Sequence, residues 1–154
     1  MSSSPPPAHG PSWPVLPPPE HTVVWSHDLT GIRDLAPART DLRDHLRAAG
    51  HTEGGGALDE VAERILLAAD ELTSNGVRHG NPPVALALAT TGTPGTYLLM
   101  VTDRAAERAP TPDPTRDPVD GGLGLIIIAT YASAHGWWPD GGTKRVWALL
   151  PLQA

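Results

Sequence analysis

Three polar side chains recur at helical spacing in the segment ELTSNGVRHG. Glu71, Asn75 and His79 are each four residues apart, so on a helix they share one face. Glu71 and Asn75 can together hold a hydrated divalent cation, because carboxylate and amide oxygens are hard ligands and Mg²⁺ commonly keeps several waters. A solvated helix face is the alternative, but Asn75 and Gly76 are poor residues for a helix interior, which favours a chemical role.

A second candidate is Asp103, which ends the apolar segment GTYLLMVTD. Its carboxylate should emerge at the end of a buried strand, where turn initiation is the simpler explanation. A carboxylate at this place can accept a hydrogen bond from the exocyclic amino group of adenine, whereas guanine presents a carbonyl oxygen there. The site therefore predicts a preference for ATP over GTP, and we expect loss of the carboxylate to weaken ATP binding and leave the fold intact.

A third candidate is the segment GGLGL, which precedes an apolar helix. Backbone N–H groups at Gly122, Leu123 and Gly124, together with the positive end of the helix, can converge on phosphates. Ordinary turns carry the same glycines, so the pattern alone is weak. No Walker A motif occurs, and Ile127 stands where a G-x-G-x-x-G motif would need glycine. The seven histidines show no spacing typical of a zinc site.

The elements that must position these residues follow from the apolar periodicity. We expect a strand in HTVVWSHDL, a helix in DLAPARTDLRDHLRAAG, a second helix from Leu58 to GNPP, a hairpin of VALALAT and GTYLLMVTD, a helix after GGLGL, and two final strands in GWW and KRVWALLPL. This order predicts a two-layer α/β sandwich with helices on one face of a mixed, mostly antiparallel sheet. The charged, proline-rich segment 104–120 predicts a long surface loop that acts as a lid.

Composition limits the class of protein. The 154 residues fit one domain, residues 21–154, after a disordered proline-rich tail of about 20 residues, for which a docking motif is the alternative. A formal net charge of −6 argues against general nucleic-acid binding. The chain has no cysteine, no apparent leader and no apolar run of membrane-spanning length. We therefore expect a cytoplasmic protein whose partners are proteins or small molecules.

Taken in order, ELTSNGVRHG, Asp103 after a strand, a variable loop, GGLGL and a closing hairpin resemble the GHKL ATPase superfamily, which has the histidine kinase-like ATPase fold. More closely, the chain resembles short actinobacterial ATP-binding regulators related to anti-sigma-factor serine kinases. The resemblance implies that Glu71 is the catalytic base and Asn75 the magnesium ligand. It also implies that Asp103 binds adenine and that the glycine-rich turn at 122–124 contacts phosphates.

The function implied by this resemblance is that of a regulator that binds Mg·ATP. Its partner would be a sigma factor or the antagonist of one, and it would phosphorylate a Ser or Thr on the antagonist. A non-catalytic interaction module of the same fold, with or without bound nucleotide, is the alternative. The sequence leaves open whether the chain forms a homodimer.

Two positions depart from the family pattern. Ala105 stands where the kinases usually have glycine two residues after the adenine-binding aspartate, which is expected to alter nucleotide affinity or lid geometry. Gly76 replaces the usual alanine after Asn75 and is expected to loosen the end of the helix. Within the loop we expect Arg116 to contact phosphate, with Arg104 and Arg108 as competitors for that role.

Overall fold

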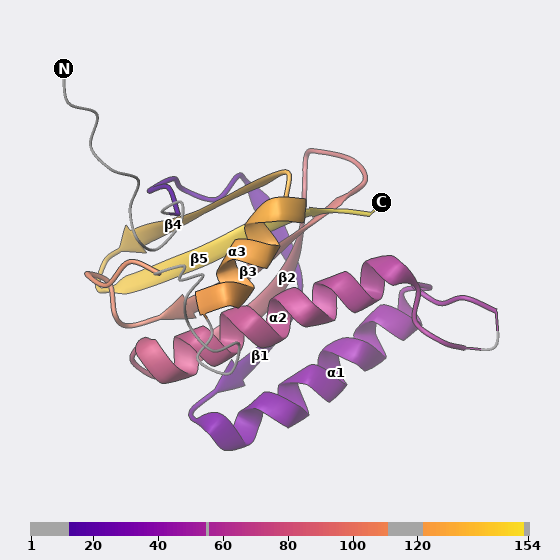
Figure 1. Ribbon diagram of the computed structural model, residues 1–154, viewed down its shortest axis with the longest axis horizontal. Helices are drawn as coiled ribbons and strands as arrows, with labels where there is room; N and C mark the ends of the chain where they lie inside the picture. The colour runs from indigo at the N-terminus through magenta and orange to yellow at the C-terminus, as the bar shows by residue number, and fades with distance from the viewer. Residues whose placement is uncertain (1–12, 55, 111–121, 153–154) are drawn as a thin grey trace.

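The computed structural model describes residues 13–54, 56–110 and 122–152. The elements are β1 (His21–Leu29), the 3-10 helix η1 (Ile32–Asp34), α1 (Leu35–Ala48), α2 (Glu60–His79), β2 (Val84–Thr91), β3 (Thr96–Asp103), α3 (Gly122–Tyr131), β4 (Ala134–Asp140) and β5 (Thr143–Pro151). Figure 1 shows the three α-helices on one side of the sheet. The predicted order of elements and the two-layer α/β arrangement are confirmed.

The sheet has five strands in the order β1-β2-β3-β5-β4. Every neighbouring pair of strands is antiparallel, which is consistent with the predicted mixed, mostly antiparallel sheet. The one parallel contact in the described part of the chain is an isolated bridge between Val15 and Trp137. In the register of β3 and β5, Asp103 at the end of one strand lies opposite Lys144 near the start of the other. The sheet therefore brings two residues together that are far apart in the sequence.

The helix boundaries have local causes. Pro37 lies in the first turn of α1, where no backbone N–H is needed, and Gly50 follows the helix with φ +91°, a conformation that favours glycine. Asp59 caps α2 by accepting a hydrogen bond from the backbone N–H of Ala62 at 2.8 Å. Of the helices that the structure describes, none is both long and apolar enough to cross a membrane.

The main core lies between the helices and the sheet. It includes Leu42 and Leu46 of α1, Ile65 and Leu72 of α2, Leu86 and Leu88 of β2, Leu99 and Val101 of β3, Leu125 and Ile128 of α3, and Val146 and Ala148 of β5. Because side chains alternate along a strand, the intervening residues face the other side of the sheet. Leu98, Met100 and Trp147 form a smaller cluster there. Both faces of the central strands are thus buried, which keeps β3 and the residue that ends it fixed in place.

The N-terminal segment 13–16 corrects the expected tail boundary. Trp13 is only 3% exposed and packs edge-on against His135, with ring centroids 4.7 Å apart. Leu16 donates its N–H to the carbonyl of Trp137, and Trp137 donates to the carbonyl of Pro14, both at 3.0 Å. Proline composition did not reveal this, because an extended proline-rich segment can still pair with an edge strand. The rest of the predicted tail, residues 1–12, lies outside the described residues.

Candidate functional site

The three polar residues of α2 lie at the border between core and surface. Glu71, Asn75 and His79 are all half-buried, so they do not form a freely solvated face. The neighbouring Gly76 is buried, and a Cβ there would lie 3.1 Å from Val101 Cγ1 and 3.3 Å from Val84 Cγ1. Glycine therefore lets α2 lie close on β2 and β3. α2 continues past Gly76 for a further three residues, to His79.

Glu71 meets the start of α3. A Cβ placed on Gly124 would overlap the Glu71 side chain, including its carboxylate, so glycine at this position makes room for Glu71. Burial raises the pKa of Glu71, Asp70 raises it further, and Arg78 opposes the shift. The structure thus brings together the predicted base and the predicted glycine-rich turn, which the sequence separates by some 50 residues.

Asp103 lies at the other end of α2. Gly80 follows the helix, and a Cβ there would lie 2.5 Å from the Asp103 carboxyl carbon and from its Oδ2. Oδ1 of Asp103 accepts a hydrogen bond from the N–H of Ala105 at 2.8 Å. The residue is 1% exposed. Ala105 therefore supports the carboxylate through its backbone, whatever its side chain does to a ligand.

Lys144, a basic residue beside Asp103, was missed as a site residue, and Arg108 was considered only for a phosphate contact. Lys144 Nζ lies 3.6 Å from Asp103 Oδ2 and donates a hydrogen bond to the carbonyl of Arg108 at 2.5 Å. Arg108 Nη1 in turn donates to the carbonyl of His79 at 3.0 Å. Burial lowers the pKa of Lys144, and the charge of Asp103 opposes that shift. The alternation of Lys144 with Val146 and Ala148 is a sequence signal for an inward-facing lysine.

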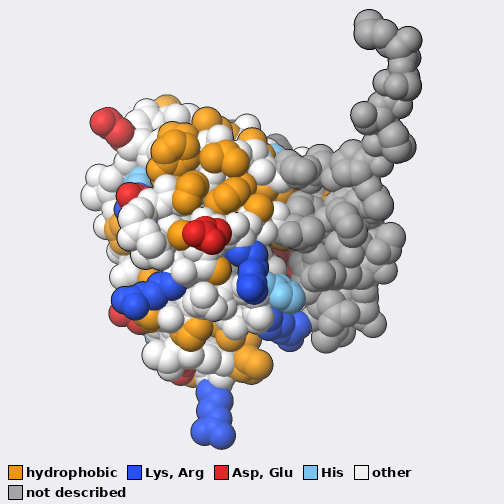
Figure 2. Space-filling model, turned by 90° about the vertical axis from the view of Figure 1, so that its left-hand side faces the viewer, with side chains coloured by type: hydrophobic (Ala, Val, Ile, Leu, Met, Phe, Trp, Pro, Cys, Tyr) orange, Lys and Arg blue, Asp and Glu red, His pale blue; other side chains and the backbone are white. Residues whose placement is uncertain are grey.

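The described parts of the site follow α2 from Glu71 to Gly80. Nine residues of helix advance roughly 14 Å. Gly124 lies near one end of this line and Asp103 near the other. Figure 2 shows the end of the molecule at which α2 and β3 finish, where Lys and Arg side chains gather below a patch of hydrophobic ones.

The fit to a nucleotide rests on the buried Nε2 of His79, which has no hydrogen-bond partner and so has the capacity to bind a ligand. At positions 80 and 124 the space that a Cβ would take is filled by the side chains of Asp103 and Glu71, so the backbone there lies directly against these two carboxylates. In the described residues, no group of three or more His, Asp or Glu side chains is placed to hold a metal ion. A cation at Asn75 would therefore take most of its ligands from phosphate oxygens and water.

Some predicted residues lie outside the described chain. Arg116 and most of the expected lid belong to residues 111–121 and are not described. Of the two competing arginines, Arg104 donates its backbone N–H to the carbonyl of Asn81 at 2.9 Å, and Arg108 contacts the end of α2. Residues 122–124 begin α3, as expected for a turn that leads into a helix.

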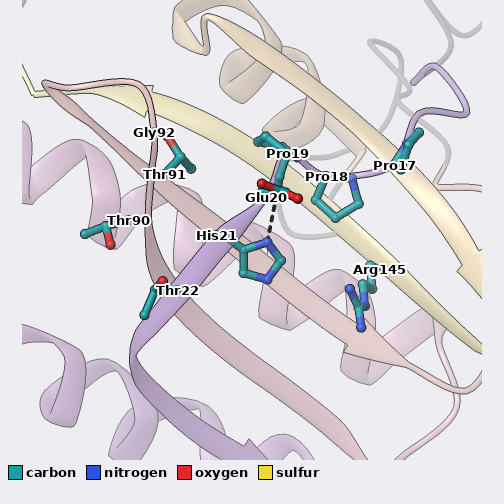
Figure 3. Close-up of a pocket in the computed structure, with 10 residues that line it drawn as sticks. All are labelled: Pro17, Pro18, Pro19, Glu20, His21, Thr22, Thr90, Thr91, Gly92 and Arg145. Atoms are coloured by element: carbon teal, nitrogen blue, oxygen red, sulfur yellow. Dashed lines mark hydrogen bonds between the residues drawn. The ribbon is translucent and has the colours of Figure 1, made fainter.

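A separate pocket of about 740 Å³ lies away from these residues (Figure 3). It is lined by Pro17, Pro18, Pro19, Glu20, His21, Thr22, Thr90, Thr91, Gly92 and Arg145. Arg145 follows Lys144 on β5, so its side chain points to the opposite face of the sheet. None of the predicted site residues lines this pocket, and its size alone does not make it the chemical site. A second pocket, of about 540 Å³, adjoins the Asp103 end and is lined by Asn81, Arg104, Ala105, Ala106, Glu107, Arg108 and Gly142.

Comparison with known proteins agrees with this fold. One similar solved structure is the crystal structure of the RsbU and RsbW domains of Rv1364c from Mycobacterium tuberculosis, with a TM-score of 0.55 and 18% sequence identity. The match covers 83% of this chain and 32% of that one, so this chain spans about a third of that structure, and the likeness shows the fold alone. No curated protein matches. The family model described as histidine kinase-like ATPase domain matches residues 32–148. The chain therefore belongs to the histidine kinase-like ATPase domain family.

Proposed function

We propose that this protein binds Mg·ATP and regulates another protein by binding it and phosphorylating a Ser or Thr on it. The observation that carries the proposal is the half-buried Glu71 carboxylate, which lies against Gly124 at the start of α3. A helix N-terminus favours phosphate groups, and a carboxylate beside it can accept a proton from an attacking hydroxyl. Membership of the ATPase domain family supports the same ligand.

In this proposal Glu71 is the general base. Bound Mg·ATP would supply the γ-phosphoryl group, and ADP would be the leaving group. Glu71 orients the hydroxyl of the protein substrate and takes its proton as the oxygen bonds to phosphorus. Burial raises the pKa of Glu71 because the ionised carboxylate is poorly solvated, and a higher pKa makes it a better proton acceptor.

The other residues bind and orient the nucleotide. Asn75 would hold Mg²⁺ through its amide oxygen, and backbone N–H groups at Gly122, Leu123 and Gly124 would bind phosphate oxygens. Asp103 would accept the hydrogen bond of the adenine amino group. The two ends of the site would then have separate tasks, with phosphoryl chemistry near Glu71 and base recognition near Asp103.

The protein partner is proposed from the sequence resemblance. A sigma factor or its antagonist would bind the surface of this domain, and the antagonist would be the phosphorylated protein. The structural relative contains an RsbW domain within a longer chain, which supports a regulatory role for this fold.

One observation favours the non-catalytic alternative. The Asp103 carboxylate is 1% exposed and already contacts Ala105 and Lys144. A domain that keeps this carboxylate for its own fold could hold a protein partner without using a nucleotide. The alternative retains the fold and the partner and loses the transfer reaction.

Calorimetric titration with Mg·ATP, followed by incubation with a candidate antagonist and ATP labelled on the γ-phosphate, separates the two functions. The proposal expects saturable ATP binding and label on the antagonist. ATP binding without labelled antagonist supports the interaction module. Absence of ATP binding by the full chain would reject the nucleotide role.

A further inference from the structure

Lys144 is an unusual residue to find at this place. It is 3% exposed, whereas lysine is almost never fully buried unless it is paired. Its ammonium group contacts two polar groups at once, the Asp103 carboxylate at 3.6 Å and the Arg108 carbonyl at 2.5 Å. Burial of a charge is costly, so these contacts must offset a considerable desolvation penalty.

The contacts of Lys144 continue to the end of α2. Arg108, whose carbonyl Lys144 holds, donates a hydrogen bond from Nη1 to the carbonyl of His79 at 3.0 Å. His79 lies one helical turn after Asn75, the proposed magnesium ligand. The ammonium of Lys144 therefore connects the end of α2, the end of β3 and the segment that follows β3.

The carboxylate of Asp103 has limited freedom to receive a base. Oδ1 accepts the N–H of Ala105 and Oδ2 lies 3.6 Å from the Lys144 ammonium, so a base amino group would share either oxygen with a group of the protein. A carboxylate oxygen accepts two hydrogen bonds, so sharing is stereochemically allowed. Lys144 fixes where Oδ2 lies and keeps its negative charge compensated before any ligand arrives. A site that is set in advance loses less entropy when it binds.

We infer that Lys144 is a positioning residue for base recognition, which holds the Asp103 carboxylate and the 105–108 segment in the geometry that receives adenine. The inference rests on the proposed function and deepens it. It assigns the affinity for the base, and not that for the phosphates, to a buried ion pair between β3 and β5.

The test compares Mg·ATP with Mg·tripolyphosphate, which has the phosphates and no base, by calorimetry on the full chain. Lys144→Met keeps an unbranched side chain that ends where the ammonium would begin, and so removes the charge. We expect its affinity for ATP to fall by about tenfold or more, as loss of hydrogen bonds to a charged group predicts, and its affinity for tripolyphosphate to stay unchanged. Lys144→Gln keeps an N–H donor for the Arg108 carbonyl, so its affinity for ATP should lie between that of the wild type and that of Lys144→Met.

Arg145→Met is the matched control, because Arg145 is the next residue of β5 and faces the opposite side of the sheet. It should bind both ligands like the wild type. Unchanged or tighter ATP binding by Lys144→Met would overturn the inference, since tighter binding would mean that Lys144 competes with the base for Asp103. Equal loss of both ligands in Lys144→Met and Lys144→Gln would also overturn it, since that pattern indicates a general structural role. Failure of the wild type to bind ATP would instead reject the proposed function.

Discussion

The two ends of the candidate site are built differently. Glu71 is half-buried, and in the described part of the chain no residue donates a hydrogen bond to its carboxylate; its place is set by packing against Gly124. Asp103 is buried and held by Ala105 and by Lys144. A carboxylate that must exchange a proton benefits from unused lone pairs, whereas one that must recognise a base benefits from a fixed orientation. The difference in environment thus matches the difference in proposed task.

The largest expected effect is at the Glu71 end. Glu71→Gln keeps the shape of the side chain and removes its ability to accept a proton, so phosphoryl transfer should fall by about 10²–10⁴-fold while ATP affinity is retained. Label transfer to the antagonist and calorimetry measure the two quantities. Glu63→Gln, on the exposed surface of the first turn of α2, is the control and should transfer label normally. Normal transfer by Glu71→Gln would break the division of tasks between the two ends.

At the other end, Asp103→Asn should weaken both the fold and the binding of ATP. The substitution leaves Lys144 buried without its counter-ion, which typically costs about 3–5 kcal/mol of unfolding free energy. Urea denaturation measures this loss. The expectation from the sequence that the fold stays intact is therefore revised, because the sequence reading did not include Lys144.

A double variant separates stability from recognition at Asp103. Asp103→Asn with Lys144→Met removes both charges and should recover much of the stability lost in the single variant. ATP affinity should stay low by on the order of 1.5–3 kcal/mol, because the acceptor for the amino group is still changed. Equal affinity for ATP and GTP in the wild type would contradict the role of Asp103 in adenine recognition.

Gly124→Ala tests the contact that positions Glu71. Alanine is the better helix residue, so propensity alone predicts a small gain in stability. Overlap with the Glu71 side chain predicts a loss of about 1–3 kcal/mol instead. Urea denaturation decides the sign, with Gly92→Ala as control because a Cβ at Gly92 meets nothing within 4 Å. In a Glu71→Ala background the loss should shrink, and an unchanged loss would show that the overlap lies elsewhere.

The smallest effect concerns pH. Burial raises the pKa of Glu71 in the folded protein, so its ionisation opposes folding. Its contribution to the unfolding free energy is present at low pH and is lost as the pH rises through the raised pKa. Phosphoryl transfer has the opposite sign, because the base must be ionised, and falls as the pH drops through the same pKa. The unfolding free energy and the rate of phosphoryl transfer, measured over pH for the wild type and for Glu71→Gln, isolate both trends as differences between the two proteins. Two trends of the same sign would argue against Glu71 as the general base.

The fold could be predicted because its signals are local. The apolar run in GTYLLMVTD, the periodicity of the segment before Asn75 and the glycine at 50 each depend on a few neighbouring residues. The reason for Gly76 could not be predicted in the same way. Its role depends on Val84 and Val101, which belong to two strands that meet α2 only in the folded chain.

The candidate site residues were proposed one by one from the sequence and stay predictions, and the contacts around them could not be predicted. The inward position of Lys144 can be read from its alternation with Val146. Its partner cannot, because the pairing of Lys144 with Asp103 depends on the register between β3 and β5, which a helix and another strand separate in the chain. Buried charge pairs of this kind are set by topology, and a single sequence shows only one half of each.

The N-terminal segment 13–16 has a consequence for self-association. Edge strands expose unpaired backbone groups that can join sheets of different chains. In this sheet the edge at β4 is occupied at its centre by Pro14 and Leu16, whereas within the described chain β1 pairs with β2 alone. With β1 as the one free edge of the sheet in the described residues, two copies could join through β1 in a closed, symmetric pair, which would stop further growth there. Removal of residues 1–16 would open the second edge and change a self-limiting contact into one that can propagate as a fibre.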